Sequence, residues 1–206
     1  MSTKTENEIL SSKTSLNPKQ RVFEKLEKIG LTELPDKILM VALKSQRKLE
    51  VYVQNPEEPK LLCTYDFTAF SGGSGPKLKQ GDKQIPEGIY SIEYLNPNSK
   101  FHLSMKVSYP NAFDRKMAER DNRENLGGDI FIHGRDVTIG CIPIGDRAIE
   151  ELYLLAEHSL KNGIKIIISP EDFRKDSYRP NILTVDWEDE LYDRIEKELK
   201  AIFPRE

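Results

Sequence analysis

Short runs rich in β-branched and aromatic residues, separated by turn residues, recur through the first half of this 206-residue chain. They cover residues 38–43, 49–53, 61–67, 89–94 and 101–109. Runs of this length and composition are typical of strands, because branched and aromatic side chains fit a pleated, partly buried surface. The chain up to residue 109 is therefore expected to be mostly β.

Helical patterns flank and follow these runs. An apolar period of three to four residues, which is typical of amphipathic helices, occurs in residues 20–30, 147–161 and 187–203. Two further short strands are expected at residues 129–132 and 164–169. Residues 110–128 are polar and lack a strong period, so we expect a surface lid or loop, part of which could form a short helix. The fold class predicted from these patterns is α+β, mostly β with flanking helices.

Charge and hydropathy exclude several classes of protein. Lys and Arg total 31 against 34 Asp and Glu, a net charge of −3, so no nucleic-acid or anionic-bilayer partner is expected. The apolar run 38–43 is far shorter than the roughly 20 residues that span a bilayer, so no membrane span is expected. The opening residues 1–8 lack the basic and apolar regions of a secretory signal, which leaves an internal location and a removed signal both open.

The segment with the most chemical content joins a histidine to a cysteine. His133 follows the predicted strand 129–132, and Cys141 lies eight positions later, directly after Gly140 and before the predicted helix 147–161. A thiolate is the nucleophile in cysteine catalysis, and a nearby imidazole and a helix N-terminus both lower the pKa of the thiol. A glycine beside the nucleophile lets backbone N–H groups approach an oxyanion. We therefore predict that Cys141 is a nucleophile and His133 its base.

Metal, nucleotide and disulfide chemistry are not expected. A zinc site would have to gather Cys63, Cys141, His102 and His133 from distant parts of the chain. The glycine-rich stretch 75–81 is not followed by Lys-Ser/Thr, so the phosphate-binding loop pattern fails. Two cysteines in a chain of this length form no disulfide framework, and Cys63, in the middle of a predicted strand, is expected to be structural. No cofactor and no metal are predicted.

The same residues resemble the signature of the L,D-transpeptidase catalytic domain family (YkuD-like fold), which is His-Gly, a spacer, then Ser/Thr-x-Gly-Cys. Here the signature reads His133-Gly134 and Thr138-Ile139-Gly140-Cys141. The blocks 75–88, 95–104 and 109–115 are also similar to a short-spacer branch of murein L,D-transpeptidase and L,D-carboxypeptidase-like proteins. The chain departs from many members at Ile139, where they have histidine, and at Pro143, where they have arginine or asparagine.

This resemblance implies a fold and a domain layout. The fold is a YkuD-like β-sandwich or barrel with a C-terminal helical extension. The implied layout is a flexible arm at residues 1–17, a helical lead-in at 18–36, the catalytic domain at 37–170 and the extension at 171–206.

The resemblance also implies an activity. It is cysteine-dependent acyl transfer at L,D-amide bonds of murein stem peptides through a thioester, with hydrolysis or release favoured over 3-3 cross-linking. A cell-envelope or periplasmic location and a monomer are the matching expectations. The alternatives are a non-catalytic murein-binding module, and an intracellular transferase that uses the same fold on a non-murein amide.

Other residues are weaker candidates for the site. Gly134, Gly140 and Thr138 are expected to support the site or an oxyanion pocket, although Thr138 could equally cap a turn. Four further candidates are substrate-binding residues, and for each a structural or solvated role is the alternative: His102, Tyr109, Arg115 and Arg135. The two arginines are included because guanidinium groups bind carboxylates in a bidentate geometry.

Overall fold

The computed structural model describes residues 16–55, 58–175 and 178–204. The arm predicted for residues 1–17 lies almost wholly outside these ranges. The helices are α2 (Pro18–Lys28), α3 (Ala112–Arg120), α4 (Asp146–Ser159), the 3₁₀ turn η1 (Leu160–Asn162) and α5 (Glu188–Ile202). The strands are β1 (Ile38–Leu43), β2 (Lys48–Val53), β3 (Lys60–Asp66), β4 (Gly88–Ser99), β5 (His102–Val107), β6 (Phe131–His133), β7 (Ile142–Pro143) and β8 (Lys165–Ser169). The predicted α+β class is confirmed.

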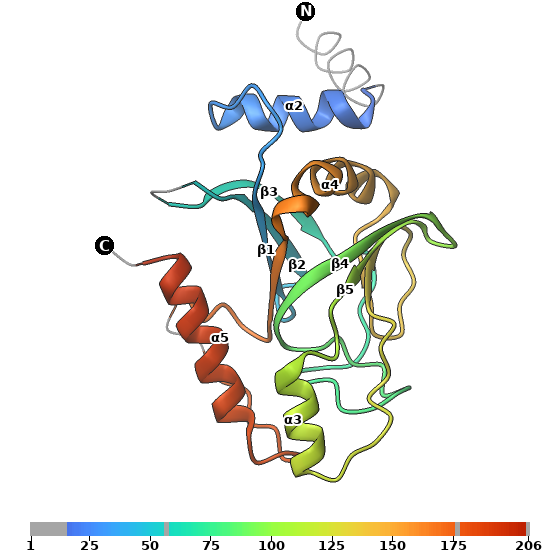
Figure 1. Cartoon of the computed structure of the whole chain (residues 1–206), viewed down its shortest axis with the longest axis vertical. Coiled ribbons are helices and arrows are strands. Elements are labelled where there is room, and N and C mark those ends of the chain that lie inside the picture. Colours follow the sequence, from blue (N-terminus) through green and yellow to red (C-terminus); the bar gives the residue numbers. More distant parts are fainter. Residues whose placement is uncertain (1–15, 56–57, 176–177, 205–206) are drawn as a thin grey trace, which may run out of the picture.

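The described strands form one curled sheet of eight in the order β3-β2-β1-β8-β4-β5-β6-β7. β1 and β8 run parallel, as do β6 and β7, and the other neighbours are antiparallel. β4 is long enough to pair with β8 at its start and with β5 at its end. This strand therefore carries the sheet round from its central part to the edge formed by β6 and β7 (Figure 1).

Helices cover both faces of the central strands. In β1, Met40 and Ala42 join the core that includes residues of α2 and α4, whereas Leu39 and Val41 join the core that includes residues of α3 and α5. Figure 1 shows α2 and α4 at one end of the molecule and α3 and α5 at the other. A strand buried on both faces is a continuous apolar run rather than an alternating one, which explains the composition of residues 38–43.

Residues 112–120 form the helix α3 where a lid or loop with a short helix was expected. A capping box starts this helix: the Asn111 side chain accepts from the Asp114 amide, and the Asp114 carboxylate accepts from the Asn111 amide. Reciprocal caps of this kind satisfy backbone donors that a helix start otherwise leaves unpaired. The helix is therefore stabilised by its capped start and by the burial of Phe113 and Met117 in the core.

A buried ion pair joins four separate segments beneath the sheet. Lys44, which follows β1, donates to the Glu87 carboxylate at 2.8 Å and to the carbonyls of Gly75 and Ile85 at 2.9 Å each. Glu87 also accepts from the Gly75 amide at 2.8 Å and from the Tyr192 hydroxyl of α5 at 2.9 Å. The Lys44 side chain is 2% exposed and the Glu87 side chain 0%. Their burial is tolerated because both charged groups are fully paired.

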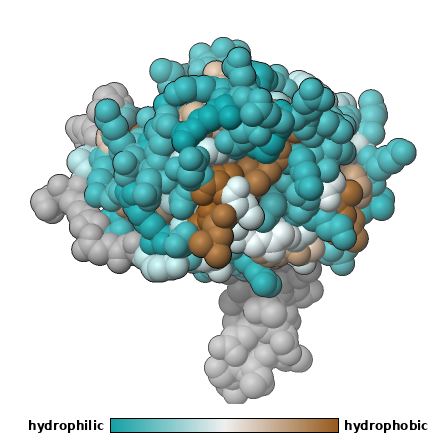
Figure 2. All heavy atoms as spheres, turned by 90° about the horizontal axis from the view of Figure 1, so that it is seen from below, coloured by the Kyte–Doolittle hydropathy of each residue, from teal (hydrophilic) through white to brown (hydrophobic). Residues whose placement is uncertain are grey.

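The surface seen from the end of the molecule with α3 and the start of α5 is largely hydrophilic, with an apolar patch near its centre (Figure 2). Among the described residues, no helix is long and apolar enough to cross a membrane.

The Lys44–Glu87 pair yields a stability prediction. Lys44→Met leaves the Glu87 carboxylate buried without its cation, and the free energy of unfolding is expected to fall by about 3–5 kcal/mol. Urea unfolding followed by circular dichroism measures this change. Lys116→Met is the matched control, since the Lys116–Glu190 pair is exposed and is expected to contribute less than about 1 kcal/mol. Equal effects of the two substitutions would contradict the assignment of Lys44–Glu87 as a structural anchor.

Candidate active site

The pairing of β6 with β7 places His133 and Cys141 on one face of the sheet. Ile132 is opposite Ile142 and His133 is opposite Pro143, so the register extended by one residue sets Cys141 beside Phe131. Side chains two apart on a strand share a face of the sheet, so Phe131, His133 and Cys141 lie on the same face. The other face, which carries Ile132 and Ile142, is part of the core. The histidine and cysteine that the sequence singled out are therefore diagonal neighbours at the sheet edge.

His133 is held in one tautomer by its own backbone neighbour. Nδ1 lies 2.6 Å from the Gly134 carbonyl oxygen. A carbonyl only accepts, so Nδ1 carries the proton and Nε2 is left as the basic nitrogen. The ring is 1% exposed, and this burial lowers the pKa of His133 below its usual range. The imidazole is therefore neutral at neutral pH and ready to accept a proton.

The Cys141 thiol is partly buried and stays protonated at rest. Its Sγ donates to the Asp129 carbonyl at 3.5 Å. Burial is the main cause that raises the pKa of Cys141, and the Asp129 carboxylate adds to it; the Phe131 amide, Lys106 and Lys77 act in the opposite direction. Both the thiol and the His133 imidazole are thus neutral at rest.

Thr138 organises the turn that ends at the thiol. Its hydroxyl accepts from the amides of Gly140 at 3.1 Å and Cys141 at 2.8 Å, and it donates to the Cys141 carbonyl at 2.8 Å. The backbone amides of Gly140 and Cys141 therefore both donate to Thr138 in this structure.

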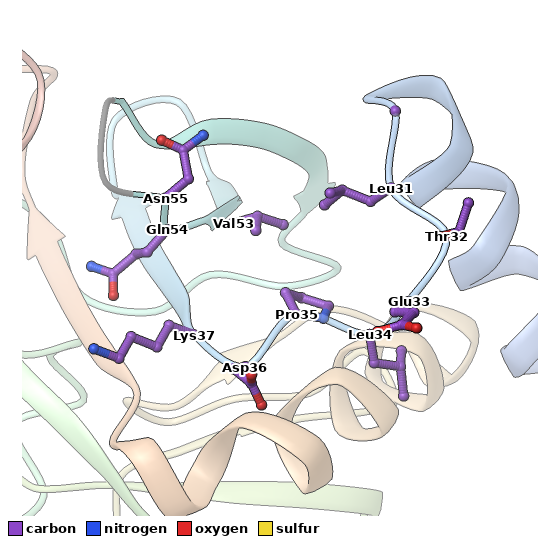
Figure 3. Close-up of a pocket in the computed structure, with 11 residues that line it drawn as sticks. Leu31, Thr32, Glu33, Leu34, Pro35, Asp36, Lys37, Val53, Gln54 and Asn55 are labelled. Carbon is purple, nitrogen blue, oxygen red and sulfur yellow. The ribbon is translucent and has the colours of Figure 1, made fainter.

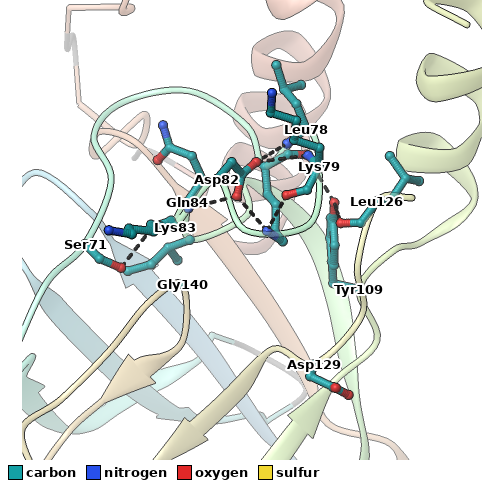
Figure 4. Close-up of polar contacts among 12 residues, drawn as sticks. Ser71, Leu78, Lys79, Asp82, Lys83, Gln84, Tyr109, Leu126, Asp129 and Gly140 are labelled. Atoms are coloured by element: carbon teal, nitrogen blue, oxygen red, sulfur yellow. Dashed lines mark hydrogen bonds and ion pairs between the residues drawn. The ribbon is translucent and has the colours of Figure 1, made fainter. Parts of the chain in front are cut away.

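The glycine-rich loop that follows β3 supports this turn from one side. Gly140 has φ +131°, and a Cβ there would lie 3.0 Å from the carbonyl oxygen of Gln84. Asp82 fixes the loop, because its carboxylate accepts from the amides of Leu78, Lys79 and Gln84 and from the Lys77 ammonium (Figure 4). The close backbone approach explains why glycine precedes the cysteine.

A cationic side chain lies in the same cross-strand row as the thiol. Lys106 of β5 is opposite Phe131 of β6, which in turn neighbours Cys141. The Lys106 ammonium lies 5.6 Å from the centre of the Phe131 ring and donates to the carbonyls of Val107 and Gly128. It is 8% exposed, so its charge is weakly screened by water.

The four candidate substrate-binding residues lie in different settings. Tyr109 is in the core, where its hydroxyl donates to the carbonyls of Lys77 and Leu126, both at 3.2 Å. Arg115 is exposed on α3 and donates to the Pro110 carbonyl. Arg135 is exposed in the loop after β6, where its amide donates to Asp146. His102 is exposed at the start of β5 and contacts Glu150 of α4 at 3.0 Å.

Some residues near the site were missed by the sequence reasoning. Phe101 stacks on the His133 ring with 4.7 Å between the ring centres. Lys106 and Asp129 adjoin the thiol, as described above. The alternation expected for residues 101–109 places Lys106 on one face of its strand. Only the pairing of β5 with β6 shows that the Cys141 thiol lies on the same face of the sheet.

Two further observations concern binding elsewhere. An open pocket of about 480 Å³ lies between residues 30–37 and the end of β2, where Leu31 and Val53 point toward each other (Figure 3). It contains none of the candidate site residues. Within the described ranges, no group of three or more His, Cys, Asp or Glu side chains is placed to hold a metal ion.

A known protein family and curated proteins are similar in sequence to this chain. The family model of the L,D-transpeptidase catalytic domain (YkuD) matches residues 36–168. The Escherichia coli K12 protein named "Putative L,D-transpeptidase YafK" is 35% identical over 122 residues, which are 58% of this chain and 47% of that protein. This chain thus spans about half the length of the curated relatives it matches.

A solved structure has the same fold. The helical cell shape determining protein Pgp2 from Campylobacter jejuni superposes with a TM-score of 0.54 at 20% sequence identity. The match covers 72% of this chain and 55% of that one.

The position of Lys106 yields a prediction for the thiol. Removing its charge by Lys106→Met is expected to raise the pKa of Cys141 further, because a cation near a thiol favours the thiolate. The rate of iodoacetamide labelling at Cys141, measured by peptide mass spectrometry from pH 6 to 10, would move to higher pH accordingly. Lys48→Met, at an exposed site on β2, is the control and should leave the profile unchanged. A profile that Lys106→Met does not move would show that the ammonium has no effect on the thiol.

Proposed function

The chain belongs to the L,D-transpeptidase catalytic domain family, and from that premise we propose that it is a cysteine acyl-transfer enzyme acting on L,D-amide bonds of murein stem peptides. The observation that carries the proposal is the placement of His133 and Cys141 on one face of the β6–β7 pair, with Nε2 of His133 left as a free base. A binding module has no need of such a pair. The murein substrate is taken from the family.

The reaction begins with a proton transfer. Nε2 of His133 takes the proton of Cys141 as Sγ attacks the amide carbonyl carbon, and the proton passes from His133 to the leaving amine as the C–N bond breaks. A thioester on Cys141 remains. Because the resting pair is neutral, this proton moves during attack and no preformed thiolate is required.

The oxyanion formed in this step needs hydrogen-bond donors. The amides of Gly140 and Cys141 are the proposed donors, and Thr138 is their resting acceptor. In this proposal the oxyanion replaces the Thr138 hydroxyl, so the turn is already shaped for an oxygen acceptor before substrate binds.

The second half of the reaction depends on the acceptor. Water gives hydrolysis or release, and an amine gives transpeptidation. We favour hydrolysis or release, because the short spacer between His133-Gly134 and Gly140-Cys141 resembles the branch with those activities. A cell-envelope location, a monomeric state and a catalytic domain over residues 37–170 followed by a helical extension complete the proposal.

Arg115 and Arg135 are proposed as contacts for the substrate carboxylate, since both side chains are exposed and guanidinium groups bind carboxylates in a bidentate geometry. His102 is exposed at the hairpin end and is also retained as a proposed contact. Tyr109 is proposed to act through packing, because its ring and hydroxyl are both engaged inside the protein.

The nucleophile is tested by Cys141→Ala. This variant is expected to fold normally and to lose turnover of purified muropeptides completely, because the substitution removes Sγ and little packing. Intact-protein mass spectrometry with and without an amine acceptor should show a thioester adduct on the wild type and none on the variant, and the products show whether water or amine resolves it. Cys63→Ala is the control and should keep both the adduct and turnover. Full turnover by Cys141→Ala would refute the mechanism.

The base is tested by His133→Ala through the pH profile. Acylation near pH 7 is expected to fall by about 100-fold or more, since general-base assistance contributes on the order of 10²–10⁴-fold. The residual rate should rise with pH and level off only above the usual range of a thiol pKa, because hydroxide replaces the base and burial raises the pKa of Cys141. Stopped-flow or quenched acylation assays from pH 6 to 10 measure this. An unimpaired, flat profile would remove His133 from the mechanism.

A further inference from the structure

The tip of the β4–β5 hairpin lies on the candidate base, and we propose that Phe101 is the positioning residue that holds the His133 imidazole in place. This inference rests on the proposed role of His133, and it adds a residue that touches neither substrate nor thiol. The tip comprises residues 99–102, between the paired residues Ser99 and His102.

The contact between the two rings is direct. The ring centres of Phe101 and His133 are 4.7 Å apart with an angle of 34° between the planes. Phe101 is 39% exposed whereas His133 is 1% exposed, so the phenyl ring stands between the imidazole and water. The residue opposite His133 in β5 is the small Ser104, which makes the hairpin tip the source of this aromatic cover.

The backbone of the tip is fixed against the segment that orients the base. A Cβ at Gly134 would lie 2.8 Å from the Phe101 carbonyl oxygen and 3.1 Å from Cβ of His102. The Gly134 amide donates to the Leu103 carbonyl at 3.2 Å. Gly134 therefore has two roles: its carbonyl holds Nδ1 of His133, and its lack of a side chain lets the hairpin tip approach.

A chain of polar contacts ties the same tip to two helices. Nε2 of His102 lies 3.0 Å from one Glu150 oxygen, and the other Glu150 oxygen lies 2.9 Å from the Arg21 guanidinium of α2. His102 has φ +74°, and the Ser99 hydroxyl accepts from the Phe101 amide at 3.1 Å. Because a residue other than glycine rarely adopts this φ, the surrounding contacts must hold it there. The Phe101 ring is thus presented by a fixed turn.

The cover has a chemical consequence for the base. Without it, water reaches the imidazole, competes for Nδ1 with the Gly134 carbonyl and favours the protonated ring. The titratable groups at this corner are His102, Glu150 and Asp146; Glu150 is paired with His102 and Arg21, and Asp146 accepts from the Arg135 amide. The lowered pKa of His133 has burial as its first cause, which agrees with a role for an apolar ring rather than for one of these charges.

The test compares Phe101→Ala and Phe101→Leu with Leu61→Ala, an apolar residue of similar exposure at 46% on β3. Imidazole resonances of the full chain, titrated by NMR without substrate, report His133 directly. Phe101→Ala is expected to raise the pKa of His133 toward its usual value near 6.5. Phe101→Leu should give a smaller rise and Leu61→Ala none. Urea unfolding of each variant checks that the fold persists.

Turnover gives the second measurement. With muropeptides, Phe101→Ala is expected to lower kcat by about 10-fold or more, with KM little changed, because a misplaced base slows proton transfer without removing a substrate contact. Phe101→Leu should recover part of this loss.

The outcomes separate this inference from the proposed function. An unchanged His133 titration in Phe101→Ala overturns the positioning role, whether or not muropeptides are processed. A shifted titration with unchanged kcat also overturns it, because the cover would then have no effect on catalysis. Failure of the wild type to form a thioester would instead count against the proposed function, and that result is read before any Phe101 variant is made.

Discussion

The ion pair of Lys44 and Glu87 is the constraint on which the site depends most. It is buried, so each charge must be matched by partners, and the groups of this cluster come from the residue after β1, the glycine-rich loop, the segment before β4 and α5. The loop it anchors carries Gln84, whose carbonyl packs against Gly140. The turn that presents the thiol is thus supported by an electrostatic cluster formed by residues distant in the chain.

Burial determines the chemistry of the thiol–imidazole pair. It lowers the pKa of His133 and raises that of Cys141, so both groups are neutral when substrate arrives. Lys106 moderates the effect on the thiol, and the Gly134 carbonyl selects the tautomer that leaves Nε2 basic. Lys106 lies on β5 and His133 on β6, and the register of these two strands sets how close the groups lie to the thiol. The electrostatics of the site therefore depend on the register of the sheet.

Local patterns in the sequence predicted much of the framework. The apolar run of β1, the helical period of α4 and the His133 to Cys141 spacing depend on neighbours along the chain, and all three have counterparts in the structure. The core position of Tyr109 and the contact of Phe101 with His133 depend on strand pairing and hairpin geometry, which composition does not encode. β7 has two residues, which is too short to give an alternation signal. The proposed substrate rests on the family, whereas the proposed chemistry rests on His133 and Cys141.

The hydrogen bond from the Tyr192 hydroxyl to Glu87 also affects the order in which the parts of the fold can form during synthesis. Tyr192 belongs to α5, which follows every other described element along the chain. While a nascent chain still lacks that helix, Glu87 is missing one of its partners and the face of β1 that packs against α5 is uncovered. The support of the turn that carries Cys141 is therefore completed late in synthesis, after Cys141 itself has been added to the chain.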